Sequence, residues 1–184
     1  MAGEKRSRLH QLFKFSAIIF VMVVVLALLN WLPLLLQKNR LQRFGSVEAA
    51  RKVLHMQTIY LPTYIPENLN LAWPPADIYA QDTPFSACIM HFTFRDSRQI
   101  GLMIQQVDSK APYGLEPLLK IKEKKSVNSV TVKNRKALLV SAVCDQDIPC
   151  NQLSWDEDST TITLTGKIPA RDIIRIAASM LPDK

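Results

Sequence analysis

The sequence predicts an α+β protein, in which a single N-terminal transmembrane helix precedes an antiparallel sheet of about six or seven strands with a helix at each end. Three observations predict this fold class. An uncharged apolar run covers residues 15–36. Beyond it, short segments of alternating apolar residues are separated by turn residues, a pattern typical of antiparallel hairpins. Two segments with helical spacing of apolar residues, near residues 46–57 and 169–180, flank these strands.

The excess basic charge lies around the apolar run. The chain has 184 residues, 48% of them hydrophobic, and a net charge of +7. Residues 1–52 contain nine Lys or Arg and two Asp or Glu, whereas residues 53–184 contain fourteen of each class. A nucleic-acid-binding protein would carry its basic residues on the folded domain. The neutral downstream part therefore argues against nucleic acid as a partner.

Residues 15–36 have the length and composition of a membrane span. These 22 residues include no charge. As a helix they would extend ~33 Å, against ~30 Å for a hydrocarbon core. The run is too uniform for an amphipathic core helix. A cleavable signal peptide is the other alternative, but it requires small residues at alternate positions after the run, and Gln37-Lys38-Asn39-Arg40 does not supply them. The sequence favours an uncleaved signal-anchor in the lipid bilayer.

The orientation of the span rests on two features other than flanking charge. Residues 1–14 contain four Lys or Arg and residues 37–52 contain five, so the positive-inside preference does not decide. The short basic tail and a downstream cysteine pair favour a cytoplasmic N-terminus and an extracytoplasmic C-terminal domain. We therefore expect a single-pass cell-membrane protein. Its predicted parts are a basic cytoplasmic tail (1–14), a transmembrane helix (15–36), a juxtamembrane helix (37–57) and an extracytoplasmic α+β domain (58–184).

The segment after the span is predicted to begin with a helix. Ser46 is a candidate N-cap for a helix that extends to about Gln57, with Glu48 in its first turn. Residues 61–69 contain two prolines and are predicted to be irregular. Residues 69–78 are predicted to form an edge strand that Pro74 and Pro75 interrupt.

Three hairpins are predicted downstream, and pairing in the first and the third keeps the apolar side chains on one face. The turn of the first is expected at residues 96–98, that of the second at residues 133–136 and that of the third at residues 156–159. Residues 137–143 are apolar on both faces and are expected to lie centrally in the sheet. The expected cross-strand pairs are Phe94 with Ile100, Phe92 with Leu102 and Met90 with Ile104 in the first hairpin, and Trp155 with Thr160 and Leu153 with Ile162 in the third.

The last strand is expected to end at Gly166, before a terminal helix with Pro169 at its first position. Its apolar stripe comprises Ile173, Ile176, Ala177 and Met180. Residues 111–126 receive no assignment. The lysine-rich part of that connection, residues 120–125, is interpreted as a solvated loop, with a membrane-surface contact as the alternative.

Cys144 and Cys150 are predicted to form a disulfide. They lie at the ends of two consecutive predicted strands, where antiparallel neighbours come within the Cα separation that a bridge accepts. A metal site is less consistent with the spacing, because there is no second cysteine pair and the histidines are scattered. Two unrelated thiols are the remaining alternative. Cys88 is expected to be a buried free thiol on an apolar strand face.

No catalytic, cofactor-binding or metal-binding motif is present in the sequence. His91 lies within a predicted strand, opposite in direction to Phe92, and is expected to be partly exposed. Five acidic residues could gather near one end of the sheet and hold a cation, although such residues are also ordinary at turns. These are Asp145, Asp147, Asp156, Glu157 and Asp158. We expect no cofactor.

Several short segments carry a family resemblance. They are Leu61-Pro62, Tyr64-Ile65-Pro66-Glu67, Val130-Thr131-Val132-Lys133-Asn134, Leu153-Ser154-Trp155, Leu164-Thr165-Gly166 and the terminal helix from Ile173 to Met180. From about Val47 onward the chain resembles an uncharacterised bacterial extracytoplasmic domain family found beyond the transmembrane helix of anti-sigma-like proteins. That family is distantly similar to the lipoprotein-carrier and sigma-regulator fold, so the resemblance implies a curved antiparallel sheet with helices on it. Fourteen residues before the membrane cannot form the sigma-binding domain of an anti-sigma protein, and the Cys144–Cys150 pair is not part of the family pattern.

Two classes of function are consistent with these observations. The first is a membrane-anchored protein, not an enzyme, whose outer domain binds an envelope protein partner or an apolar ligand in a sensing, regulatory or assembly role. The second is a membrane-anchored enzyme with a non-obvious site on the outer domain. A pocket that contains His91 and carboxylates would favour the enzyme, and an apolar concave surface would favour binding.

Overall fold

The computed structural model describes residue 16 and residues 19–28, 41–53, 58–112, 115 and 119–183. The chain divides into two compact units, Met1–Arg40 and Leu41–Lys184. In the first unit, residue 16 and residues 19–28 are helical, and the other half of the predicted span 15–36 lies outside the described residues. Among the described residues, no helix is both long enough and apolar enough to span a membrane.

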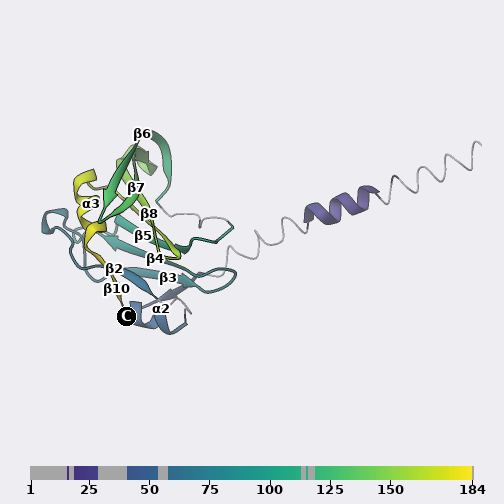
Figure 1. Cartoon of the computed structure of the whole chain (residues 1–184), viewed down its shortest axis with the longest axis horizontal. Coiled ribbons are helices and arrows are strands. Elements are labelled where there is room, and N and C mark those ends of the chain that lie inside the picture. The colour runs from purple at the N-terminus through teal and green to yellow at the C-terminus, as the bar shows by residue number, and fades with distance from the viewer. Residues whose placement is uncertain are drawn as a thin grey trace, which may run out of the picture. The chain divides into compact units, whose positions relative to one another are not determined.

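The second unit contains one large antiparallel sheet and a small two-stranded ribbon (Figure 1). The eight strands of the sheet, in spatial order, are β1 (Gln42–Phe44), β3 (Asp77–Gln81), β4 (Ala87–Thr93), β5 (Ile100–Asp108), β9 (Thr160–Gly166), β8 (Pro149–Glu157), β7 (Arg135–Cys144) and β6 (Ile121–Val132). The ribbon pairs β2 (Ile59–Pro62) with β10 (Met180–Asp183). The helices are α2 (Val47–Val53) and α3 (Ala170–Ser179), and two 3₁₀ turns are η1 (Glu67–Leu69) and η2 (Asp145–Asp147).

The first face of the sheet carries the main core. Apolar residues of β4, β5, β9 and β8 pack there against α2, α3 and the β2–β10 ribbon. The predicted stripe of α3 is confirmed for Ile173, Ile176 and Ala177, which are buried, whereas Met180 is buried as the first residue of β10 and not as part of the helix. The helix begins at Ala170, with Pro169 as its N-cap, one residue later than predicted. Ser46 caps α2 as predicted, since its Oγ accepts the N–H of Ala49 at 3.1 Å. Residues 54–57 of that predicted helix lie outside the described residues.

The second face has its own smaller core over β4, β5 and β7. Ile89, Met103, Val140 and both bridged cysteines belong to it, and Leu41, Tyr79 and Leu115 pack against them. The expectation that His91 is partly exposed is therefore wrong. Its side chain points away from Phe92, as predicted, but it is only 2% exposed because this face is covered as well.

The predicted hairpins are present, with corrections to their register. Phe92 lies opposite Leu102 and Met90 opposite Ile104, as predicted, but a bulge after Phe92 places Thr93 opposite Ile100. In the third hairpin, Trp155 lies opposite Ile162 instead of Thr160. This shift of two residues leaves every side chain on its predicted face, since side chains alternate with a period of two. The strands simply continue to Glu157 and Thr160, so the turn is shorter than expected.

Five segments differ from their predicted structure. Residues 42–44, which were predicted to belong to the juxtamembrane helix (37–57), form the strand β1 instead. Leu61 and Pro62 belong to β2 rather than to an irregular segment. The edge strand predicted over residues 69–78 is β3, which begins only at Asp77 and lies between β1 and β4. Residues 121–126 belong to β6, so most of the lysine-rich run is a strand and not a loop. β7, which was expected to be central, lies one position from the β6 edge.

Candidate functional site

A groove of about 640 Å³ opens beside the β2–β10 ribbon. Its walls come from the ribbon, from the loop that follows β2, and from the segment around Leu71 and Trp73. Most lining side chains are aliphatic, aromatic or proline. Because β2 and β10 come from opposite ends of the domain, the groove exists only once this ribbon is paired.

Three large apolar side chains of the groove are exposed. Trp73 is 52% exposed and Leu181 is 51% exposed, and Tyr64 is also exposed. The ring of Trp73 stacks on the buried ring of Phe92, with centroids 5.9 Å apart and an interplanar angle of 22°. This stack leaves the indole anchored on one side and accessible on the other. Such a rigid apolar surface is typical of binding sites.

The loop after β2 is held to the C-terminal end of α3. The N–H of Thr63 donates to the carbonyl of Ser179 at 3.3 Å, and the Thr63 hydroxyl donates to the same carbonyl at 2.8 Å. The N–H of Tyr64 donates to Ser179 Oγ at 3.2 Å. The guanidinium of Arg175, on α3, lies 5.2 Å from the centroid of the Tyr64 ring. The aromatic ring at this end of the groove is therefore positioned by the main helix.

The groove also contains one cation and two carboxylates. Arg95 donates from Nε to the carbonyl of Leu71 at 3.1 Å, which fixes the arginine against the groove wall. Glu67 and Asp183 lie along the same groove, and Asp183 is ion-paired with Arg51 of α2. A guanidinium has five donors, so Arg95 keeps donors for a polar group of a ligand.

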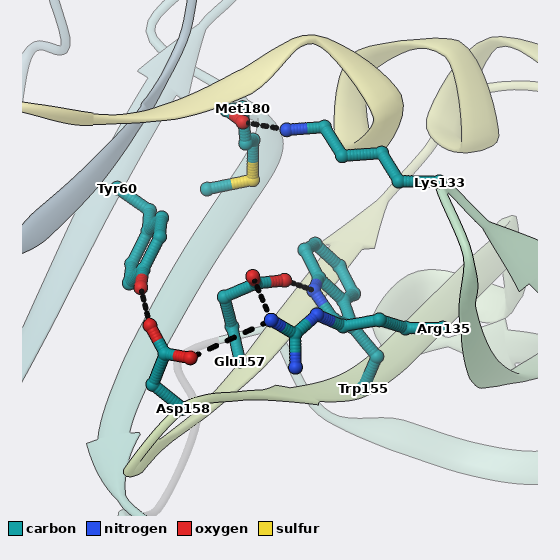
Figure 2. Close-up of polar contacts among 7 residues, drawn as sticks. All are labelled: Tyr60, Lys133, Arg135, Trp155, Glu157, Asp158 and Met180. Atoms are coloured by element: carbon teal, nitrogen blue, oxygen red, sulfur yellow. Dashed lines mark hydrogen bonds and ion pairs between the residues drawn. The ribbon is translucent and has the colours of Figure 1, made fainter.

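A polar cluster behind the ribbon secures it to the ends of the sheet strands (Figure 2). Tyr60 donates its hydroxyl to Asp158 at 3.0 Å, and burial together with this bond raises the pKa of Tyr60 to about 12. Arg135 pairs with Glu157 at 2.7 Å and with Asp158 at 3.5 Å. Glu157 also accepts the indole N–H of Trp155 at 3.3 Å. A second contact to the ribbon comes from Lys133 Nζ, which donates to the carbonyl of Met180. The cluster joins β2 and β10 to the β6–β7 and β8–β9 turns.

The residues singled out from the sequence lie elsewhere. Cys144 and Cys150 form the disulfide, with Cα atoms 5.8 Å apart, in the core of the second face. Cys88 is the buried free cysteine of the described residues, and burial raises its pKa to about 12. His91 stays buried beside Tyr79, and burial lowers its pKa.

The five acidic residues do not gather at one end of the sheet, contrary to the expectation. Asp145 and Asp147 lie in η2, immediately before β8, whereas the other three lie at the far end of β8. Glu157 and Asp158 form ion pairs there with Arg135. Among the described residues, no group of three or more His, Cys, Asp or Glu could hold a metal ion.

The groove was missed in the sequence because its walls are distant along the chain. The segment from Leu61 to Pro66 carries an available signal, with two prolines and a tyrosine between aliphatic residues. Leu181 and Pro182 repeat that character at the C-terminus. Only their pairing brings the two segments together.

Comparison with known proteins identifies the family of this chain. Neither a curated protein nor a solved structure matches the chain. One family model matches residues 59–180, about two thirds of the chain, from the start of β2 to the first residue of β10. The chain therefore belongs to the uncharacterised family described as "Domain of unknown function (DUF4367)".

Proposed function

We propose that this chain is a single-pass membrane-anchored protein whose extracytoplasmic domain binds a protein partner or an apolar ligand in the groove beside β2 and β10. The observation that carries the proposal is the exposure of Trp73, Tyr64 and Leu181 along one groove. Contiguous exposed apolar surface is costly in water and marks interaction sites. An envelope sensing, regulatory or assembly role accords with this binding and with the resemblance to domains of anti-sigma-like proteins.

The composition of the groove supports binding more than catalysis. A catalytic pocket would bring a titratable base close to a nucleophile or to paired carboxylates. The described residues that line the groove include Glu67, Asp183 and Arg95. His91 is not among them, because it lies opposite Met103 on the second face of the sheet. Arg95 is suited to orient a polar group of a ligand, while the aromatic and aliphatic walls supply the buried area.

The anchor and its orientation rest on the sequence and on the cysteine pair. Residues 15–36 are long enough and apolar enough for a span, and no cleavage pattern follows them. The bridge between Cys144 and Cys150 suits an oxidising compartment, which supports an extracytoplasmic position for the outer domain.

Site-specific photo-crosslinking in the native membrane tests the groove. Leu181 lies in the groove and Leu138 on the second face, and their exposures of 51% and 49% make them a matched pair. We expect a light-dependent adduct of defined mass from a photoreactive residue at Leu181 and none from the same residue at Leu138. The additional substitution Trp73→Ala should abolish the adduct. Equal adduct formation from both positions would contradict a site in the groove. So would an adduct at Leu181 that persists in the Trp73→Ala variant.

Fractionation and a reporter fusion test the anchor. The full chain should stay in the membrane pellet after a carbonate wash, at its unprocessed mass, because an apolar span is not released by washing. A reporter active only outside the cytoplasm should be active when fused after Lys184. Release of the chain from the pellet, or a shortened mass, would contradict the predicted anchor. Activity of a cytoplasmic reporter at that position would contradict the predicted orientation.

A further inference from the structure

The outer edge of the sheet at β6 is long, exposed and basic. β6 is the longest strand, with 12 residues, and residues 122–129 are all exposed. It pairs with β7 on one side, and within the described part of the chain no strand pairs with its other side. An open edge of this length is a ready template for another strand, which proteins usually block or cover.

Addition of another strand is blocked only along the first half of β6. Register shifts interrupt the β6–β7 pairing between Ile121 and Glu123 and again between Lys124 and Ser126. Such bulges twist an edge strand out of line with an incoming strand, and lysines on the edge discourage pairing through their charge. From Ser126 to Val132 the pairing with β7 continues one residue at a time. This second half is regular and uncharged, so it retains the geometry that strand addition requires.

The backbone groups that face outward can be identified from the turn. Lys133 and Asn134 form a two-residue turn, so Val132 and Arg135 are a hydrogen-bonded pair. Hydrogen-bonded and non-hydrogen-bonded pairs alternate along an antiparallel ladder. The N–H and C=O groups of Val127, Ser129 and Thr131 therefore point away from β7. The alternate residues Asn128 and Val130 bond to β7.

Charge selects the kind of strand that fits. Residues 120–136 contain seven Lys or Arg and one Glu, a net +6, although residues 53–184 as a whole are neutral. The rest of the domain therefore carries −6. Among the described residues, Lys124, Lys125 and Lys136 form no ion pair, in contrast to Lys122, which pairs with Asp147 at 3.3 Å. Two copies of this edge would repel each other, whereas an acidic segment would be attracted.

We propose that β6 is a docking edge on which an extended acidic segment of a partner protein adds as a further antiparallel strand. The segment would bond to Val127, Ser129 and Thr131 through its backbone, and its acidic side chains would approach Lys124 and Lys125 at one end and Lys136 at the other. Backbone bonds would supply affinity and the lysines would supply selectivity. This site is separate from the groove beside β2 and β10, so it goes beyond the proposed function.

The probe is a short synthetic peptide with alternating Thr and Val at its centre and Glu at both ends. It is added to the full chain in uncharged nanodiscs, and amide exchange is followed residue by residue by NMR. We expect new protection at Val127, Ser129 and Thr131, with little change at Asn128 and Val130, which are already bonded. The double variant Lys124→Glu/Lys125→Glu should raise the Kd about tenfold, as expected for the loss of a few exposed charge pairs. Lys110→Glu, an exposed lysine elsewhere, is the matched control and should leave the Kd unchanged.

Three results would overturn the proposal. The first is peptide binding without alternating protection. The second is binding of anionic phosphatidylglycerol vesicles, but not of the peptide, with the same dependence on Lys124 and Lys125, which would make the edge a lipid-contact surface. The third is concentration-dependent dimerisation that protects the same three amides without peptide, which would make a second copy the occupant. Trp73→Ala should leave peptide binding intact, so failure at the edge and failure at the groove are separable.

Discussion

The side-chain amide of Gln106 makes both backbone hydrogen bonds of Tyr60. Gln106 Oε1 accepts the N–H of Tyr60 at 2.9 Å, and Gln106 Nε2 donates to the carbonyl of Tyr60 at 2.6 Å. Gln106 lies on β5 and is fully buried, so one side chain replaces a neighbouring strand and attaches β2 to the main sheet. Because Tyr60 faces Gln106, the β2–β10 ladder uses the alternate residues of β2. Pro62 and Pro182 therefore lie where a missing N–H costs no ladder bond.

Gln106→Leu should destabilise the outer domain by about 2–4 kcal/mol, because it leaves a buried N–H and a buried C=O without partners. Gln105→Leu is the matched control, since Gln105 is adjacent, faces the other side and makes one long bond of 3.4 Å to the carbonyl of Leu115. Urea titration with pulse proteolysis of the full chain measures both. Equal losses from the two variants would show that Gln106 has no special part in holding β2.

Tyr60 should make stability fall at alkaline pH. Its folded pKa is about 12, above the ordinary value of 10.0, because burial and the hydrogen bond to Asp158 oppose ionisation. The unfolded chain therefore loses this proton first, and stability declines from about pH 10 towards 12. Tyr60→Phe should remove this part of the decline. Ultraviolet titration of phenolate checks the assignment, and a Tyr60 that ionises at the ordinary pH would refute it.

His91 should make the outer domain less stable in mild acid. Burial lowers its pKa below 6.5, although Asp77 on β3 opposes this shift and is itself paired with Arg43 on β1. Tyr79 lies against the same ring. The unfolded chain therefore binds a proton that the folded chain resists, and stability falls as the pH drops below about 6.5. In unfolding measurements across this range, His91→Phe should flatten the dependence. An unchanged slope in the variant would assign the effect to another group.

The cysteines should react as one bridge and one inaccessible thiol. Native protein should resist iodoacetamide, because Cys88 is buried and its pKa is raised to about 12. Unfolding without reductant should expose one thiol per chain, and mass spectrometry of unreduced peptides should find Cys144 joined to Cys150. Cys144→Ala/Cys150→Ala should cost about 2 kcal/mol from the lost loop constraint. Three reactive thiols, or a bridge that includes Cys88, would contradict this pairing.

Local patterns in the sequence determined the elements whose partners are close along the chain. The face of each hairpin, the stripe of α3 and the cap at Ser46 follow from side-chain periodicity and from residues a few positions apart. Even a register error of two residues at Trp155 kept the correct face. The pairing of Cys144 with Cys150 could also be predicted, because the two residues lie at the ends of consecutive strands; that both side chains lie on the second face was shown only by the structure.

Contacts between distant segments were decided only by the tertiary structure. β10 pairs with β2 across more than a hundred residues, and no periodicity in either segment points to the other. His91 is buried because Tyr79 and its neighbours cover a strand face that the alternation of β4 alone would leave exposed. The groove and the basic edge arise in the same way: one requires the ribbon to form, and the other requires β6 to lie at the end of the sheet. Strand position within a sheet is a property of non-local pairing, so the sequence could predict the three hairpins but not which strand would remain open.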